Sequence, residues 1–126
     1  MQRLDGSGAR KLTDTPLRHE DVPRWSPDGS RIVYWRDGNV HVIDTLGTPI
    51  WSTEDGVSRQ PSFSPDGKYI AFTHNYLVTI MDAEKTDYRK QLSSQPGGNP
   101  VWSPIAPTIA FEGGVGFGYE LFLVVI

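Results

Sequence analysis

The sequence predicts an all-β protein built from three copies of one repeat, and two observations carry this prediction. The first is a phrase that recurs: Pro-x-Trp-Ser-Pro-Asp-Gly begins at residue 23, Pro-x-Phe-Ser-Pro-Asp-Gly at residue 61, and a shorter Pro-x-Trp-Ser-Pro at residue 100. The second is the even spacing of these starts, which are 38 and 39 residues apart. A fixed period of this size is typical of repeat architectures, whose units bury their faces against one another.

The repeated phrase predicts a strand, a tight turn and a second strand. In Ser-Pro-Asp-Gly, proline presets φ, aspartate accepts hydrogen bonds from nearby backbone amides, and glycine tolerates a positive φ. Apolar triplets follow at residues 32–34, 70–72 and 109–111, with a small residue in the middle of each. Because both faces of such a strand are apolar, we expect each sheet to be covered on both sides.

Two further strands complete each predicted unit. We expect third strands over residues 40–44, 77–82 and 119–125, and more polar fourth strands over 49–52 and 88–92. Four antiparallel strands in a repeat of this length describe one blade of a β-propeller. We therefore expect a single propeller-repeat domain over 1–126, with blades at 22–53, 60–92 and 99–126, the last without an outer strand of its own.

The first 13 residues predict the missing outer strand. Residues 4–13 match the end of a repeat, with a glycine-rich turn before Leu12 and Thr13. Three blades are fewer than the 4–8 of a closed propeller, whereas two chains supply six. We expect each chain to form half of a six-bladed ring, with residues 1–13 closing the last blade of its partner in a homodimer. The alternative is a fragment of a larger propeller with no independent function.

Composition restricts the partners. The formal net charge of −3 argues against a nucleic-acid binder, which usually has a basic face. The longest apolar run, residues 121–126, is far shorter than the roughly 20 residues of a membrane helix, so we expect no membrane insertion. The chain has no cysteine, which excludes disulfides and thiolate metal sites.

The repeats resemble those of the TolB-like propeller family. The segments 23–29, 61–67 and 6–13 match the family pattern closely, and 100–107 matches in part. The resemblance implies a six-bladed ring that acts as a non-catalytic scaffold for proteins or peptides. It also implies a periplasmic location, although the sequence shows no signal peptide. Similar blades gate prolyl-oligopeptidase-like enzymes, which leaves a gating propeller open as an alternative.

No motif for catalysis is present. The sequence lacks Gly-x-Ser-x-Gly, and His19, His41 and His74 have no metal-ligand spacing. We therefore expect no enzymatic activity, cofactor or metal, with a hydrolase site in the channel as the alternative.

The loops at one end of the predicted channel form the candidate binding site. They join the fourth strand of one blade to the first of the next, and the second strand to the third within a blade. Asp21 and Arg59 hold equivalent positions, which suggests a pair across adjacent blades. The candidate binding residues are Arg18, His19, Asp21, Arg36, Arg59, His74, Asn99 and Phe117.

Overall fold

The computed structural model describes residues 8–14, 19–84, 88–115 and 118–126. These residues form eleven β-strands and no helix. The first four are β1 (Glu20–Trp25), β2 (Arg31–Arg36), β3 (Asn39–Asp44) and β4 (Pro49–Ser52). The next four are β5 (Ser58–Phe63), β6 (Tyr69–His74), β7 (Leu77–Asp82) and β8 (Arg89–Gln91). The last three are β9 (Gly97–Trp102), β10 (Thr108–Val115) and β11 (Gly118–Val125).

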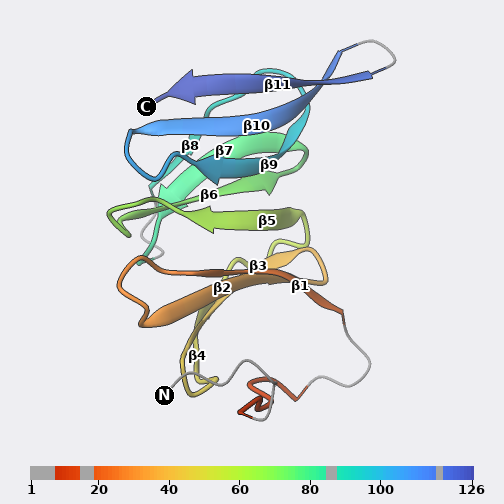
Figure 1. Cartoon of the computed structure of the whole chain (residues 1–126). Helices are drawn as coiled ribbons and strands as arrows, with labels where there is room; N and C mark the ends of the chain where they lie inside the picture. The colour runs from red at the N-terminus through yellow and green to blue at the C-terminus, as the bar shows by residue number, and fades with distance from the viewer. Residues whose placement is uncertain (1–7, 15–18, 85–87, 116–117) are drawn as a thin grey trace.

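The strands form three antiparallel sheets in chain order (Figure 1). The first sheet has the order β1-β2-β3-β4 and the second β5-β6-β7-β8, whereas the third has only β9-β10-β11. The all-β class, the propeller blades and the alignment of the repeats are thereby confirmed. The described part of the chain contains no helix with the length and apolar character of a membrane span.

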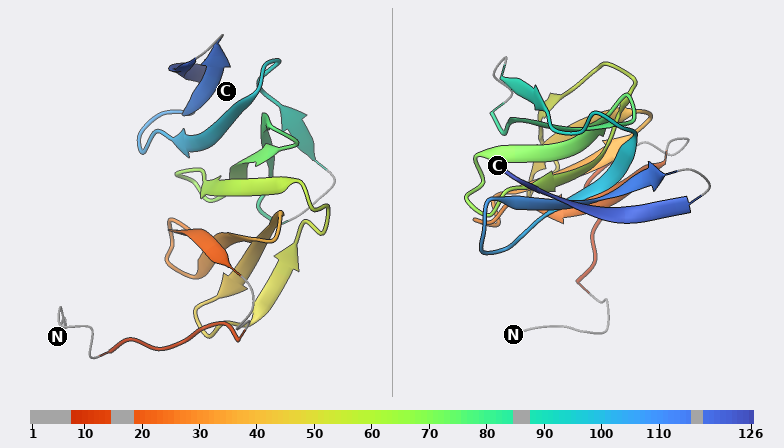
Figure 2. Two further views of the ribbon diagram at one scale, coloured as in Figure 1. Left: turned by 90° about the vertical axis from the view of Figure 1, so that its right-hand side faces the viewer. Right: turned by 90° about the horizontal axis from the view of Figure 1, so that it is seen from above.

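The three sheets stack face to face along a curved arc (Figure 2). The first strands of the sheets approach one another, β1 against β5 and β5 against β9, so they form the inner edge of the arc. The fourth strands lie at the outer edge. This arrangement is that of consecutive propeller blades, with the first strands facing the channel.

The Ser-Pro-Asp-Gly turns are held by their own side chains. In the first blade the Asp28 carboxylate accepts hydrogen bonds from Ser26 Oγ and from the backbone and hydroxyl of Ser30, at 2.7–2.9 Å. The hydrogen bonds from the Ser30 backbone and the Ser26 hydroxyl lower the pKa of Asp28 to about 2. Ser64 and Asp66 repeat the arrangement in the second blade. These residues therefore build the scaffold.

In each four-stranded blade, a side-chain hydroxyl just after the fourth strand accepts a hydrogen bond from the backbone of the third strand. Thr53 Oγ1 accepts a hydrogen bond from the buried backbone N–H of Val40 at 3.0 Å, just past the end of β4. Ser93 Oγ accepts the N–H of Val78 at 2.9 Å at the same place in the second blade. An unpaired buried N–H is costly, so these hydroxyls stabilise the junction between the third and fourth strands.

Two hydrophobic clusters fill the spaces between blades. The seam between the first and second blades contains Val33, Val42, Phe63 and Ile70. The indole N–H of Trp51 adds a hydrogen bond across this seam, to the Ala83 carbonyl oxygen at 2.9 Å.

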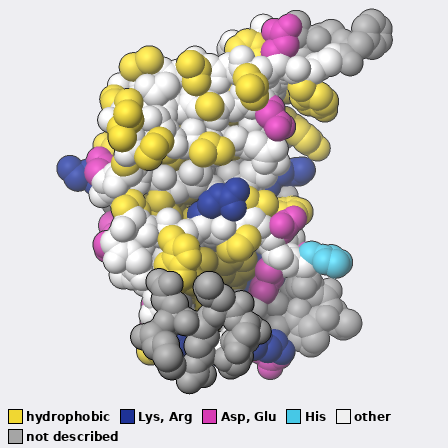
Figure 3. All heavy atoms as spheres, in the orientation of Figure 1, with side chains coloured by type: hydrophobic (Ala, Val, Ile, Leu, Met, Phe, Trp, Pro, Cys, Tyr) yellow, Lys and Arg dark blue, Asp and Glu magenta, His cyan; other side chains and the backbone are white. Residues whose placement is uncertain are grey.

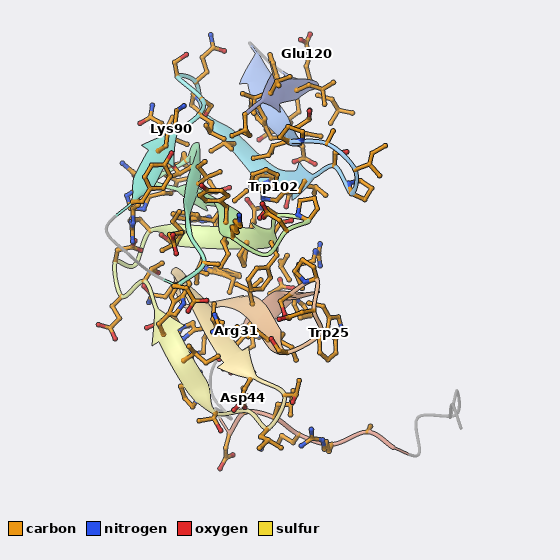
Figure 4. All side chains as sticks on the ribbon, turned by 90° about the vertical axis from the view of Figure 1, so that its left-hand side faces the viewer. Trp25, Arg31, Asp44, Lys90, Trp102 and Glu120 are labelled. Carbon is orange, nitrogen blue, oxygen red and sulfur yellow. The ribbon has the colours of Figure 1, made fainter. Side chains whose placement is uncertain are left out.

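The seam between the second and third blades repeats this packing. It contains Ala71, Ile80, Trp102 and Ile109, with Val124 against them. In both seams, an aromatic residue that ends a first strand packs on a small-residue face of the preceding blade. Figure 4 shows Trp102 in this position, between the sheets.

The described N-terminal residues form no strand in this single copy. Residues 8–14 lie against the first blade, where Leu12 borders a cavity with Ile32, Tyr34 and Ile43. Arg10 donates a hydrogen bond to the carbonyl oxygen of Thr45. The outer strand expected over residues 1–13 depends on a second chain and stays a prediction, and its first seven residues lie outside the described part.

Candidate functional site

The sheet registers place the predicted loops of the blades at the same end of the channel. Ser58, the first residue of β5, pairs with His74 at the end of β6, and His74 pairs with Leu77 at the start of β7. In the first blade Glu20 pairs with Arg36, which pairs with Asn39. The starts of the inner strands and the hairpins between second and third strands therefore share this end, which we name the channel end.

Each inner strand is irregular at the channel end. The register shifts between Asp21 and Arg24, between Arg59 and Ser62, and opposite the segment from Gly98 to Val101. At each shift the residue before proline has a positive φ: Val22 at 54°, Gln60 at 57° and Asn99 at 48°. Such bulges re-aim side chains and are frequent next to functional sites. Sequence reasoning missed them, because a residue before proline normally favours extended backbone.

One bulge connects two blades. The side-chain oxygen of Gln60 accepts hydrogen bonds from Thr73 Oγ1 and from the backbone N–H of Asn99, each at 3.0 Å. Asn99 in turn donates from Nδ2 to the carboxylate of Glu112 at 3.0 Å. Gln60 therefore ties the inner strand of the second blade to that of the third, and this contact shapes the space between them.

A groove of about 510 Å³ lies at the channel end between the second and third blades. Its walls come from both blades and carry one cation, one carboxylate and two tyrosines. The residues that give it this character are Arg59, Gln60, Tyr76, Gly98, Glu112 and Tyr119.

Each wall of the groove carries one charged and one aromatic side chain, Arg59 and Tyr76 on the second blade and Glu112 and Tyr119 on the third. The Arg59 guanidinium lies over the Tyr76 ring, 5.3 Å from its centroid, and the described residues provide no carboxylate partner for it. Glu112 stands on the third blade, where Asn99 holds it. Tyr76 is 62% exposed and Tyr119 84% exposed. Exposed aromatic rings and arginine are the groups that most often anchor a polypeptide partner.

On the third-blade wall of the groove, Gly97 and Gly98 expose backbone without side chains. A Cβ on Gly97 would stand 2.9 Å from the Phe111 ring, and a Cβ on Gly98 3.0 Å from Gln60 Oε1. A side chain at either position would need Phe111 or Gln60 to shift, and because both residues are glycine, the start of β9 presents backbone to the groove. Backbone without side chains beside aromatic rings lets an extended peptide approach closely.

The structure distributes the predicted binding residues over several environments. Arg59 lines the groove and Asn99 supports it, whereas Arg36 pairs with Glu20 at 3.2 Å on the first blade. His19 precedes β1 and Asp21 lies in it, and both are exposed. Arg18 and Phe117 lie outside the described residues.

The pairing suggested for Asp21 and Arg59 is wrong. Among the described residues, these two side chains form no ion pair. Asp21 instead accepts a hydrogen bond from the Val22 backbone at 2.8 Å, and Arg59 stacks on Tyr76. The bulges at Val22 and Gln60 turn the two inner strands locally, and equivalence in sequence did not show where their side chains point.

His74 belongs to a polar cluster at the edge of the channel end. Ser58 Oγ donates to Asp55 Oδ2 at 2.8 Å and lies 3.1 Å from His74 Nδ1, which is 3.3 Å from the same carboxylate oxygen. Burial alone would raise the pKa of Asp55. Hydrogen bonds from Ser58 and Val57, with the charges of His74 and Arg89, outweigh burial and lower this pKa.

This cluster lacks the arrangement of a catalytic triad. In a triad the serine and the acid bind different nitrogens of the histidine, whereas here both approach Nδ1. Ser58 is also fully buried, so a substrate could not reach its hydroxyl. The cluster instead joins the loop after β4 to the end of β6. The described residues contain no group of three or more potential metal ligands.

Comparisons with known proteins agree with the propeller geometry. No family model matches the chain. The chain is 28% identical over 118 residues to the uncharacterized peptidase YuxL of Bacillus subtilis (strain 168), in an alignment that covers 79% of this chain and 18% of that protein. The chain thus spans less than a fifth of this relative.

The solved structures that superimpose on this chain include β-propeller domains. The putative TolB from Agrobacterium tumefaciens superimposes with a TM-score of 0.53 at 16% identity, over 92% of this chain and 61% of that one. The β-propeller domain of Cps50 (Swd1) from Myceliophteria thermophila gives 0.65 at 15% identity, over 85% and 40%. The RRP9 WD40 repeats give 0.66 at 16%, over 82% and 34%. The sheet order, the inner-strand geometry and these likenesses together identify the fold of the chain as a β-propeller, similar to that of the putative TolB and of the WD40 repeats.

Proposed function

We propose that the protein is a non-catalytic propeller scaffold that binds an extended segment of a protein or peptide in the channel-end groove. The observation that carries the proposal is the groove itself, with its opposed Arg59 and Glu112, two exposed tyrosines and bare glycine backbone. An extended peptide can satisfy the charges with its side chains and approach the glycine backbone closely, because no side chain stands there. Loops held by a rigid scaffold are frequent sites for such contacts.

The proposed scaffold includes a second copy of the chain. Two arcs of three blades supply the six blades of a closed ring, and residues 1–13 of each copy serve as the outer strand of the other copy's third blade. β11 supports this assembly, because its outer edge carries no further strand among the described residues. An unpaired edge of this length and apolarity favours the addition of a strand.

The test is a selection of peptides from a displayed library on the purified protein, followed by affinity measurements on the selected peptides. We expect Arg59→Ala and Tyr76→Ala each to weaken binding at least tenfold, since each removes an anchor of the groove. Lys68→Ala is the matched control, because Lys68 is exposed in the turn between β5 and β6, at the opposite end of the blade. Peptides that bind all three variants equally would contradict the proposal.

A second candidate follows from the similarity to the peptidase YuxL. In this alternative, the three blades belong to a propeller that controls access to a peptidase domain on the same or another chain. The two candidates differ in their ligand. A gating propeller would bind an added hydrolase domain and restrict the length of peptide that the hydrolase cleaves, whereas the scaffold would retain its peptide without cleavage.

The non-catalytic part of the proposal has its own test. A fluorophosphonate probe labels serines that a neighbouring base activates, and we expect no labelling of Ser58, because Asp55 and His74 hold its buried hydroxyl in a structural cluster. Labelling that Ser58→Ala abolishes would show a hydrolase site in this chain.

A further inference from the structure

The aromatic residue that ends each inner strand has a different environment in the first blade. Phe63 is 8% exposed and Trp102 is 9% exposed, whereas the equivalent Trp25 is 62% exposed. The prolines of the same phrase show the same contrast, since Pro61 and Pro100 are fully buried and Pro23 is exposed. Figure 4 shows Trp25 projecting from the first blade. Trp25 is thus equivalent to the residues that pack between blades, but no described blade packs against it.

The two buried aromatic residues share one kind of socket. Phe63 clusters with Val33 and Val42, which pair across β2 and β3 of the preceding blade. Trp102 clusters with Ala71 and Ile80, which pair in the same way across β6 and β7. The socket is therefore a small residue of the second strand beside an aliphatic residue of the third.

The third blade carries an unused copy of this socket. Ala110 of β10 pairs with Leu123 of β11, at the position that Val33–Val42 and Ala71–Ile80 occupy in the other blades. Leu123 is 75% exposed, and its neighbours on the same face of β11, Leu121 and Val125, are 83% and 76% exposed. Figure 3 shows hydrophobic side chains gathered over this end of the molecule. An apolar patch of this kind marks an interaction surface.

We propose that this face of the third blade docks the first blade of a second copy, with Trp25 of one copy in the Ala110–Leu123 socket of the other. This inference rests on the proposed two-copy ring and specifies the residues that form the contact between the two copies. Two such seams, related by a two-fold axis, close the ring. The occupant is a second copy because the chain itself provides both halves of a seam that it already forms twice.

The N-terminal segment must move when this seam forms. In the single copy, Leu12 and Thr13 border a cavity together with Ile32, Tyr34 and Ile43. This is the face of the first blade that also carries Trp25, the partner of Ile32. A blade docked on this face would occupy the same space. The seam therefore displaces residues 8–14 and frees them for another position.

The freed segment fits the open edge of β11. Leu121 of β11 is equivalent to Val40 of β3 and Val78 of β7. Each lies three residues before the third-strand residue that pairs with the isoleucine of the second strand, namely Val124, Ile43 and Met81. Thr13 follows the proposed N-terminal strand as Thr53 and Ser93 follow β4 and β8. In the register of the first blade, the Thr13 hydroxyl of one copy accepts the N–H of Leu121 of the other, and Lys11 stands opposite Leu123.

The first experiment measures the mass of the full chain by size-exclusion chromatography with light scattering, over micromolar to submillimolar concentrations. We expect the wild type to have the mass of two copies and Leu123→Glu the mass of one. Leu46→Glu is the matched control, because Leu46 is also 75% exposed but lies in the turn between β3 and β4. Circular dichroism checks that each variant is folded.

A wild type with the mass of one copy, a polymer larger than two copies, or a Leu123→Glu variant that assembles like the control would overturn the seam. Such a failure can be told from failure of the proposed function. The groove lies within one chain, so peptide binding that depends on Arg59 is measured on the Leu123→Glu variant as well.

The second experiment tests the position of the N-terminal segment. The chain has no cysteine, so single cysteines report on chosen pairs without background. Lys11→Cys mixed with Leu123→Cys should form a disulfide-linked pair on mild oxidation, because directly opposed residues on neighbouring strands have close Cβ atoms. Lys11→Cys mixed with Leu46→Cys should not. Equal cross-linking in both mixtures would overturn the exchange of the strand.

Discussion

Substitution of Gly38 by alanine tests how the channel end is held. Gly38 and Gly29 both lie in hairpin turns of the first blade with nearly equal backbone angles, φ of 76° and 73°. A Cβ on Gly38 would lie 2.3 Å from the carbonyl oxygen of Gly56, whereas a Cβ on Gly29 would have no atom within 4 Å. The pair therefore separates backbone strain, which is common to both positions, from steric overlap, which occurs only at Gly38.

The overlap cannot relax freely, because the two loops are tied together. Ser58 donates its backbone N–H to the Gly38 carbonyl oxygen at 2.7 Å, and Gly56 donates to Asn39 Oδ1 at 2.9 Å. The left-handed backbone costs an alanine about 1 kcal/mol at either site. Overpacking adds about 1–3 kcal/mol at Gly38 alone, so Gly38→Ala should be less stable than Gly29→Ala by that amount.

Urea unfolding followed by tryptophan fluorescence measures this difference. For a small domain, a difference of 2 kcal/mol corresponds to a shift in midpoint of about 1 M at unchanged slope. Both variants are compared at one protein concentration, since assembly makes the midpoint depend on concentration. Equal midpoints for Gly38→Ala and Gly29→Ala would refute the argument that this turn is held against the loop that follows β4.

Three further predictions concern stability. Thr53→Val should lower the free energy of unfolding by about 1–3 kcal/mol, because it leaves the buried N–H of Val40 unpaired; an unchanged urea midpoint would contradict this role. Trp51→Phe should lower it by about 1 kcal/mol, through loss of the hydrogen bond to the neighbouring blade, and an equal stability would show that the bond contributes nothing. Folding lowers the pKa values of Asp28 and Asp66 from the ordinary value of 3.8, for Asp28 to about 2, so their contribution is present above 3.8 and is lost as the pH falls through the lowered values. The double variant Asp28→Asn/Asp66→Asn should therefore show a smaller loss of stability between pH 4 and pH 2 than the wild type, and an identical profile in acid titrations would contradict the assignment.

The repeat period predicted the blades correctly, because equivalent positions of each repeat pack in the same way and therefore carry similar residues. The apolar triplets at 32–34, 70–72 and 109–111 align position by position, and the structure places all three as second strands of their sheets. Local turn chemistry explains the Ser-Pro-Asp-Gly hairpins, whose hydrogen bonds lie within a few residues. Features that depend on neighbours in sequence were therefore accessible without the structure.

The groove was less accessible because it is made by two blades. Its position at the channel end followed from the order of the strands, and Arg59 was among the predicted residues. The roles of Gln60 and Tyr76 were missed, because a bulge with positive φ before proline re-aims the inner strand. The link from Gln60 to Asn99 spans 39 positions, and no local pattern in the sequence signals it.

The sequence by itself determined the repeat, the blade and the number of blades, because alternation and turn chemistry act over a few residues and recur with the period. Only the tertiary structure decided which faces of the blades are covered. Trp25, Phe63 and Trp102 are equivalent in sequence, yet Trp25 alone is exposed, since burial depends on whether another blade stands beside the strand. That difference, invisible in the repeated phrase, locates the seam that we propose for a second copy.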